Sequence, residues 1–184
     1  MLNKVKYLLK KSNIFLKGRI YYYGVSTLLV KEMNDNIIDF EVIQRGLKNG
    51  MYQFIGSGSS RRVFDLENGY VVKSALNYGG ITQNKMEYNV YNQEKNEFFA
   101  PILAISDDTK LLIMKKGERL WSINQILQYY QVYNMRELVS NSYFMEIRRT
   151  YGLAAGDLVR KSSWGMIDQV PVLVDYGYTG RRRR

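Results

Sequence analysis

Five places in the sequence carry groups that could handle phosphates. The stretch IGSGSSRRVF, residues 55–64, lies between two apolar runs, and its glycines would let backbone N–H groups approach phosphate oxygens. Lys73 lies within the apolar run VVKSA, and a lysine on the inward face of a strand needs an anionic partner. Glu87 is a candidate for that partner, while Asp157 and Asp175 add two further carboxylates.

Two residue types are missing, and their absence limits the chemistry. The chain has no cysteine, so disulfides, thiolate nucleophiles and zinc–cysteine sites are excluded. It has no histidine, so imidazole can be neither general base nor metal ligand, which excludes Ser-His-Asp hydrolases and zinc proteases. The groups that remain available for catalysis are carboxylates, lysines and a bound hard cation such as Mg²⁺.

The charge of the chain is positive and unevenly placed. The net charge is +10 over 184 residues; seven basic residues precede the first acidic one, Glu32, and the sequence ends in four arginines. Such blocks favour an acidic partner, which could be nucleic acid, an anionic surface or an acidic protein, although a solvated basic face is an equally good explanation. No apolar run is long enough to span a membrane and no secretion signal stands out, so we expect a cytoplasmic protein.

The elements that must position these groups follow from local patterns. Residues 2–11 have helical periodicity, residues 19–31 favour a strand or strand pair, and residues 37–47 fit a helix or a strand equally well. Residues 51–76 predict three short strands joined by hairpins, with Asn68-Gly69 as a strong turn signal. Residues 80–96 predict a helix.

The second half of the chain differs in character. Residues 101–116 predict another hairpin, and residues 121–152 look helical almost throughout. PVLVDYG, residues 171–177, predicts a short strand that ends on Asp175. We therefore expect an α+β chain with four parts. These are a basic extension (1–49), a β-rich lobe (50–116), a helical lobe (117–180) and a basic tail (181–184).

The order of the motifs resembles the protein-kinase-like family. IGSGSSRRVF is similar to its glycine-rich loop, VVK to its strand lysine, GDLVRKS to its catalytic loop and DYG to its Asp-Phe-Gly triplet. Asp157 and Asp175 are 18 residues apart (175 − 157), as is usual in the family. The resemblance covers roughly residues 50–179. It implies a two-lobed fold: an antiparallel sheet with one helix like the family's αC, then a truncated, mainly helical C-lobe.

The resemblance also implies roles for individual residues and the cofactors ATP and Mg²⁺. Lys73, held by Glu87, would bind the α- and β-phosphates; Asp175 would coordinate the metal, with Ser162 as a second ligand. Asp157 would orient the attacking hydroxyl and accept its proton. The residues implied for nucleotide binding are Gly56, Ser57, Gly58, Ser59, Ser60, Arg61 and Lys73.

Several positions depart from the family pattern. Arg61 replaces the third loop glycine, so it either contacts a phosphate or marks a site that no longer holds ATP. Ala155-Gly156 precede Asp157, which is similar to the His-Gly-Asp of small-molecule kinases, and Ser162 stands where asparagine is usual. Nine residues follow Asp175 (184 − 175), which indicates a minimal domain like the short kinase-like proteins of bacteria and phages.

Three functions follow as hypotheses. The first is an ATP- and magnesium-dependent phosphotransferase, acting on serine or threonine of a host protein or of itself. The second is an impaired pseudokinase that serves as an interaction or regulatory module. The third is a basic nucleic-acid-binding protein, and nucleotidyl transfer stays open as a further chemistry. Glu94 and Glu97 also remain rivals of Glu87 for the pairing with Lys73.

Overall fold

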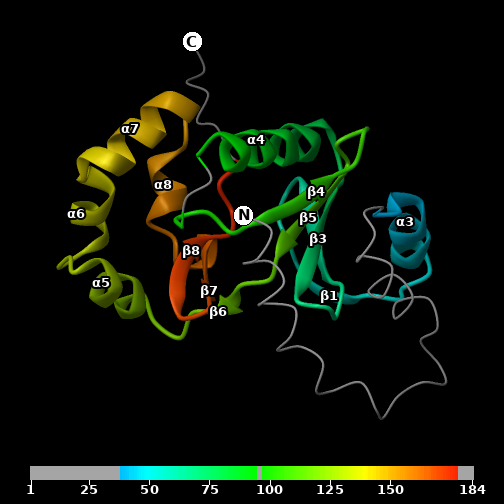
Figure 1. Cartoon of the computed structure of the whole chain (residues 1–184), viewed down its shortest axis with the longest axis horizontal. Coiled ribbons are helices and arrows are strands. Elements are labelled where there is room, and N and C mark those ends of the chain that lie inside the picture. Colours follow the sequence, from blue (N-terminus) through cyan, green and yellow to red (C-terminus); the bar gives the residue numbers. More distant parts are fainter. Residues whose placement is uncertain (1–37, 95–96, 178–184) are drawn as a thin grey trace, which may run out of the picture. The chain divides into compact units, whose positions relative to one another are not determined.

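The structure is a computed structural model that describes residues 38–94 and 97–177 (Figure 1). All its elements belong to one compact unit that begins at Phe40. The helix predicted at 2–11, the strands predicted at 19–31 and the basic blocks at the two ends lie outside the described residues. No helix in the described part is long and apolar enough to cross a membrane.

A five-stranded antiparallel sheet forms the first half of the described chain. Its order is β1-β2-β3-β5-β4. The strands are β1 (Gln53–Ser57), β2 (Arg61–Asp65), β3 (Tyr70–Ala75), β4 (Ile102–Ile105) and β5 (Leu111–Lys115). Both predicted sets of hairpins are confirmed, and Gly69 adopts φ +86° in the β2–β3 turn, a conformation that favours glycine.

Two helices accompany this sheet. Residues of the ambiguous segment form α3 (Phe40–Lys48), and the helix predicted at 80–96 is α4 (Tyr78–Glu94). The Asn77 side chain accepts a hydrogen bond from the Gly80 N–H at 3.2 Å, as an N-cap does. Figure 1 shows α4 lying along the sheet, and it packs on β3, β4 and β5.

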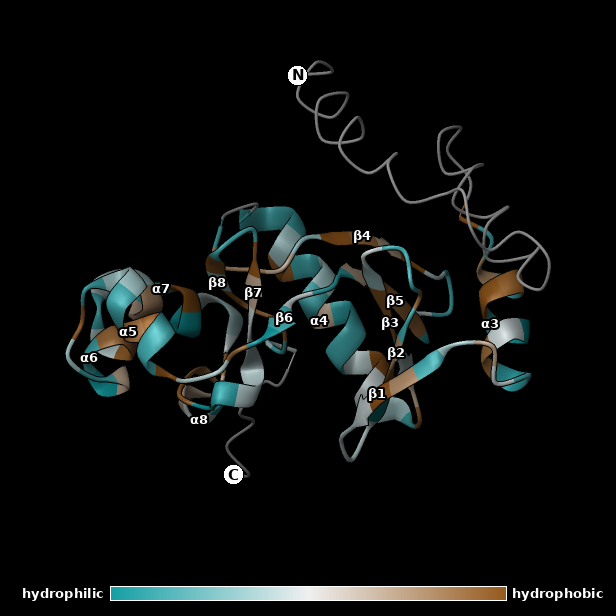
Figure 2. Cartoon of the chain, turned by 90° about the horizontal axis from the view of Figure 1, so that it is seen from below, coloured by the Kyte–Doolittle hydropathy of each residue, from teal (hydrophilic) through white to brown (hydrophobic). Residues whose placement is uncertain are grey.

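The buried face of α4 contains unusually polar residues. Gly80, Asn84, Glu87 and Val90 recur at helical spacing and are all buried, and Asn84 and Glu87 have no exposed surface. Figure 2 shows α4 mostly in hydrophilic colours beside apolar strands. Buried polar groups must find partners, so the α4–sheet interface has to be a network of hydrogen bonds and charges.

The second half combines short helices with a second sheet. The helices are α5 (Asn124–Tyr130), α6 (Met135–Ser140), α7 (Ser142–Tyr151) and α8 (Ala155–Leu158). The mainly helical character predicted for 121–152 is confirmed, but the segment is divided into three helices, because Gln131 turns left-handed at φ +54° and Asn134 and Asn141 cap new helices. The antiparallel sheet β6-β7-β8 joins β6 (Glu118–Arg119), β7 (Trp164–Ile167) and β8 (Val170–Leu173).

β8 confirms the strand predicted before Asp175, whereas β7 was not predicted. Val172 and Leu173 are almost completely buried, and Leu173 also bridges to Phe99, at the start of the segment leading into β4. The two sheets therefore share one core, and the end of β8 is brought to the five-stranded sheet.

Gly80 shows how closely the β1–β2 turn packs on α4. A Cβ at Gly80 would lie 2.2 Å from the Ser60 carbonyl oxygen, whereas a Cβ at Gly58 would meet nothing within 4 Å. An unhindered helical glycine gains about 1 kcal/mol on replacement by alanine. We expect Gly80→Ala instead to lower the free energy of unfolding by about 1–3 kcal/mol, as overpacked sites do.

The measurement is urea unfolding followed by circular dichroism. Gly58→Ala is the matched control and should stay within about 0.5 kcal/mol of the wild type, as open surface positions do. A Gly80→Ala variant more stable than the wild type would show that the turn does not rest on α4.

Candidate functional site

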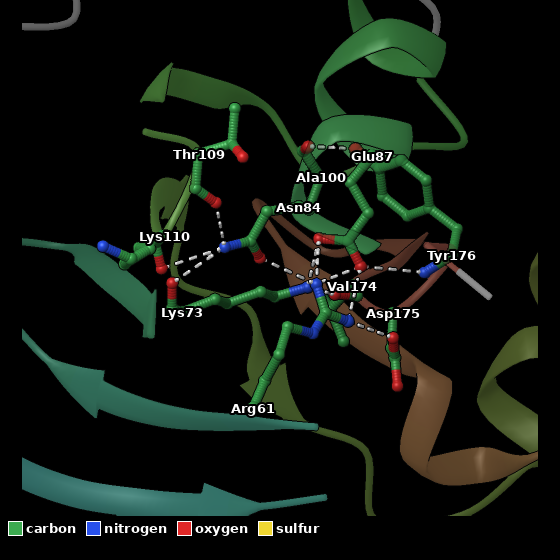
Figure 3. Close-up of polar contacts among 10 residues, drawn as sticks. All are labelled: Arg61, Lys73, Asn84, Glu87, Ala100, Thr109, Lys110, Val174, Asp175 and Tyr176. Atoms are coloured by element: carbon green, nitrogen blue, oxygen red, sulfur yellow. Dashed lines mark hydrogen bonds and ion pairs between the residues drawn. The ribbon is translucent and has the colours of Figure 1, made fainter. Parts of the chain in front are cut away.

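Four charged side chains meet at one point, three from consecutive elements and one from a segment far along the chain (Figure 3). Lys73 comes from β3, Glu87 from α4, Arg61 from the first position of β2, and Asp175 from the segment after β8. Lys73, Glu87 and Arg61 are buried, with 5%, 0% and 7% of their surface exposed, whereas the Asp175 side chain is 55% exposed. The cluster is therefore closed on the α4 side and open at Asp175.

Glu87 is the centre of the cluster. Lys73 Nζ donates to Oε1 at 2.9 Å and to Oε2 at 2.8 Å. Arg61 approaches end-on, with Nη2 at 2.9 Å from Oε1 and Nη1 at 2.9 Å from Oε2. Burial by itself would raise the pKa of Glu87, but the charges and hydrogen bonds of Arg61 and Lys73 outweigh it and lower the pKa to about 2. Glu87 is therefore ionised at every physiological pH.

Asn84 fixes the orientation of Arg61. It lies one helical turn before Glu87, and its Oδ1 accepts from Arg61 Nη1 at 3.2 Å. Its amide nitrogen donates to the carbonyl oxygens of Thr109 at 3.0 Å and Lys110 at 3.1 Å. Because these carbonyls bind the amide nitrogen of Asn84, its amide oxygen faces the guanidinium. Two side chains of α4, Asn84 and Glu87, therefore hold Arg61 in place.

The triplet Asp175-Tyr176-Gly177 is clamped between the sheet and α4. Lys73 Nζ donates to the Val174 carbonyl oxygen, and the Tyr176 N–H donates to Glu87 Oε1 at 3.2 Å. The Tyr176 ring packs on Phe99 at 4.6 Å between centroids, and a Cβ at Gly177 would lie 2.5 Å from a backbone oxygen of α4. Tyr176 therefore enters the core, while Asp175 stays accessible and accepts from Arg61 Nη2 at 2.7 Å.

Asp157 is the second accessible carboxylate of this region. It lies in α8, its side chain is 20% exposed, and Arg160 Nη1 is 3.3 Å from its Oδ1. Burial raises the pKa of Asp157; the Arg160 charge opposes this shift, and the Asp175 charge adds to it. Asp157 is therefore a better proton acceptor than an ordinary surface aspartate.

The β1–β2 turn is tied to the start of α4. The Ser60 carbonyl accepts from the Leu76 N–H at 2.8 Å, the Ser59 carbonyl accepts from the Asn77 side chain at 3.2 Å, and Gly58 N–H donates to Arg61 O at 2.9 Å. Gly56 and Gly58 have no neighbour within 4 Å of an added Cβ, and neither adopts a positive φ. The fold does not need glycine at these two positions, which leaves room for a ligand beside the turn.

Of the residues that the sequence singled out, the structure brings Arg61, Lys73, Glu87 and Asp175 into contact. Lys73 pairs with Glu87, while its rival Glu94 accepts a hydrogen bond from Tyr151 and Glu97 is exposed. Asn84 and Tyr176 were not singled out. The helical spacing of Asn84 from Glu87 and the position of Tyr176 next to Asp175 are the signals that could have found them.

Ser162 lies in a short 3₁₀ turn and is exposed. It is Ser163 that lies against the triplet, because its carbonyl oxygen accepts from the N–H groups of Val174 at 2.8 Å and Asp175 at 3.3 Å.

The guanidinium on Asp175 disfavours a magnesium ion at this carboxylate. One oxygen of Asp175 already accepts from a guanidinium, and the serine beside Asp175 offers it a backbone carbonyl that is itself hydrogen-bonded. Among the described residues no group of three or more acidic side chains could hold a metal. Mg²⁺ demands near-octahedral oxygen ligands and is repelled by a fixed cation at its ligand. Magnesium therefore stays a prediction from the family resemblance alone.

No protein-family model and no curated protein matches the chain. Among solved structures, the streptomycin–ATP–APH(2″)-IIa ternary complex matches 77% of this chain and 71% of its own, with 14% identity and a TM-score of 0.41. The gentamicin–APH(2″)-IIa complex gives the same values. ADP-bound aminoglycoside phosphotransferase APH(2″)-Ib matches 76% of this chain and 71% of its own, with 15% identity and a TM-score of 0.45.

At these TM-scores the likeness is loose and says nothing about chemistry. The described residues themselves confirm the α+β class: a five-stranded antiparallel sheet with one helix along it, followed by a mainly helical part. The chemistry of the site is taken from the contacts of this chain alone.

The buried carboxylate yields a prediction about stability. In Glu87→Gln two cations, Lys73 and Arg61, stay buried without their shared anion. We expect the free energy of unfolding at pH 7 to fall by about 3–5 kcal/mol, as when one partner of a buried ion pair is removed. Urea unfolding measures it. Glu118→Gln, at an exposed position of β6, is the control and should change little; equal effects of both variants would contradict the buried cluster.

The low pKa of Glu87 yields a second prediction. Because its pKa is about 2 in the folded chain against 4.5 as the reference value, its stabilisation is complete above pH 4.5 and disappears as the pH falls toward 2. This contribution is about 3 kcal/mol by linkage. Unfolding measured from pH 6 to pH 2 should therefore show a steeper acid-side loss for the wild type than for Glu87→Gln. Parallel profiles would mean that Glu87 titrates normally.

Proposed function

We propose that the chain is an ATP-binding phosphotransferase of the protein-kinase-like type that transfers the γ-phosphoryl group to a hydroxyl. The observation that supports this most is the Lys73–Glu87 pair, because the lysine also donates to the carbonyl oxygen just before Asp175. The pair thereby joins the β1–β3 sheet, where a nucleotide would lie, to the two accessible aspartates, where transfer would take place.

Each residue has a physical task in such a reaction. Lys73 neutralises phosphate charge, and the open space at Gly56 and Gly58 allows phosphates to approach the turn. Asp157 orients the acceptor and takes its proton. The acceptor oxygen forms a bond to the γ-phosphorus, and the bond from that phosphorus to the bridging oxygen breaks. ADP leaves with the bonding electron pair.

The surroundings of Asp157 favour an anionic or neutral acceptor. Arg160, whose side chain is 68% exposed, and the exposed Lys161 lie within four residues of it, and Lys161 Nζ donates to the Trp121 carbonyl oxygen at 3.4 Å. A polycationic aminoglycoside would meet like charge here. Serine or threonine in an acidic protein segment is the better acceptor, in keeping with the predicted protein substrate.

A catalytically impaired binding module is the second candidate. The observation that favours it is the contact of Arg61 with Asp175, which engages one carboxylate oxygen that a metal would need. Nucleic-acid binding through the basic ends stays a prediction, since those ends lie outside the described residues.

Asp157 separates the two candidates. With labelled ATP and an acidic serine-containing peptide or protein, Asp157→Asn should lower the transfer rate by about 10²–10⁴-fold, because it removes the proton acceptor. The ATP dissociation constant, measured by calorimetry, should change less than about threefold, since an amide keeps the shape of the side chain.

Asp168→Asn is the control, because Asp168 lies in the β7–β8 turn and pairs with Lys115 at 2.8 Å, away from the cluster. Equal transfer by wild type and Asp157→Asn would overturn the assignment of Asp157. ATP binding without transfer to any acceptor would favour the binding module.

A further inference from the structure

Arg61 lies where a kinase-like site has no side chain. It replaces the third glycine of the loop motif, yet it points inward at the first position of β2 and is 7% exposed. Its neighbour Arg62 is exposed on the opposite face of the strand. The arginine at 61 is thus built into the site, whereas the one at 62 is a surface residue.

We propose that the Arg61 guanidinium takes the place of a divalent cation at this site, so that the chain binds the polyphosphate of a nucleotide without a metal. The inference rests on the proposed function, because it takes the nucleotide site as given. It adds that the positive charge facing Asp175 comes from a side chain of the protein and not from a bound metal ion.

The contacts of Arg61 show that the charge is fixed. Nη1 and Nη2 each bind one oxygen of Glu87 at 2.9 Å, and Nη1 also donates to Asn84. The bond to Asp175 at 2.7 Å is the fourth, and it is the only one to a partly exposed partner. A phosphate oxygen can therefore replace Asp175 on Nη2 while the three buried contacts keep the guanidinium in position. Arginine suits this role because its planar fork stays charged at every pH of interest.

The charge balance of the cluster supports the same assignment. Arg61 and Lys73 carry two positive charges, and Glu87 and Asp175 carry two negative ones, so the cluster is neutral before any ligand arrives. A metal ion at Asp175 would add positive charge beside a guanidinium that cannot deprotonate. A polyphosphate would instead meet the Arg61 guanidinium already held in place, with the charge of Lys73 beside it, without the cost of ordering these cations at binding.

The test is calorimetric binding of ATP to the full chain, once in excess EDTA and once in Mg²⁺. For the wild type we expect dissociation constants within about threefold of each other. Arg61→Gly, which restores the family's glycine, should bind at least about tenfold more weakly in EDTA, because a charge-assisted contact is lost. Mg²⁺ should then recover most of its affinity. Arg62→Gly is the matched control and should behave as the wild type.

Each other outcome has a definite meaning. Wild-type binding only in Mg²⁺ would overturn this inference and leave the proposed function standing, whereas no binding in either condition would overturn both. Unchanged EDTA binding by Arg61→Gly would also overturn the inference. If circular dichroism shows that Arg61→Gly is unfolded, Arg61→Lys decides. The lysine keeps the charge, so binding in EDTA within about tenfold of the wild type supports the inference, and a strict need for Mg²⁺ overturns it.

Discussion

One fully buried carboxylate, Glu87, determines how the rest of this structure is assembled. A charge without exposed surface must be paired and hydrogen-bonded, and Glu87 satisfies this need with Lys73 from β3, Arg61 from β2 and the Tyr176 N–H from the segment after β8. Two strands of one hairpin, and a segment 89 residues away from Glu87 in sequence, thereby converge on one helix. The geometry of the candidate site is a consequence of this single requirement.

The polar face of α4 follows from the same constraint. A helix that packs on a sheet normally presents apolar residues, but α4 presents Asn84 and Glu87 there, and its packing depends on complete hydrogen bonding. Stability and site geometry are therefore coupled, because a change that releases Arg61 or Lys73 also loosens the contact between helix and sheet. The close approach of Gly80 to Ser60 ties the β1–β2 turn to the same helix.

The unusual feature is the second cation on Glu87. Lys73 alone would leave Asp175 free, and the site would then carry an accessible carboxylate pair with Asp157. Arg61 engages Asp175 and makes the cluster neutral, so the environment that a nucleotide meets differs from one prepared for a metal ion.

The sequence by itself determined the hairpins of the first sheet, the helix α4 and the strand before Asp175, because strand alternation, helical periodicity and turn residues are local properties. Its composition also determined that imidazole and thiol chemistry are absent. The sequence also supplied Lys73, Asp157 and Asp175 as chemically capable groups. Only the tertiary structure decided that Glu87 rather than Glu94 pairs with Lys73, that Arg61 points inward onto Asp175, and that Ser163 rather than Ser162 lies against that aspartate. The physical reason is that a buried charge selects its partners by three-dimensional proximity and loss of water, and neither quantity is encoded in the spacing of residues along the chain.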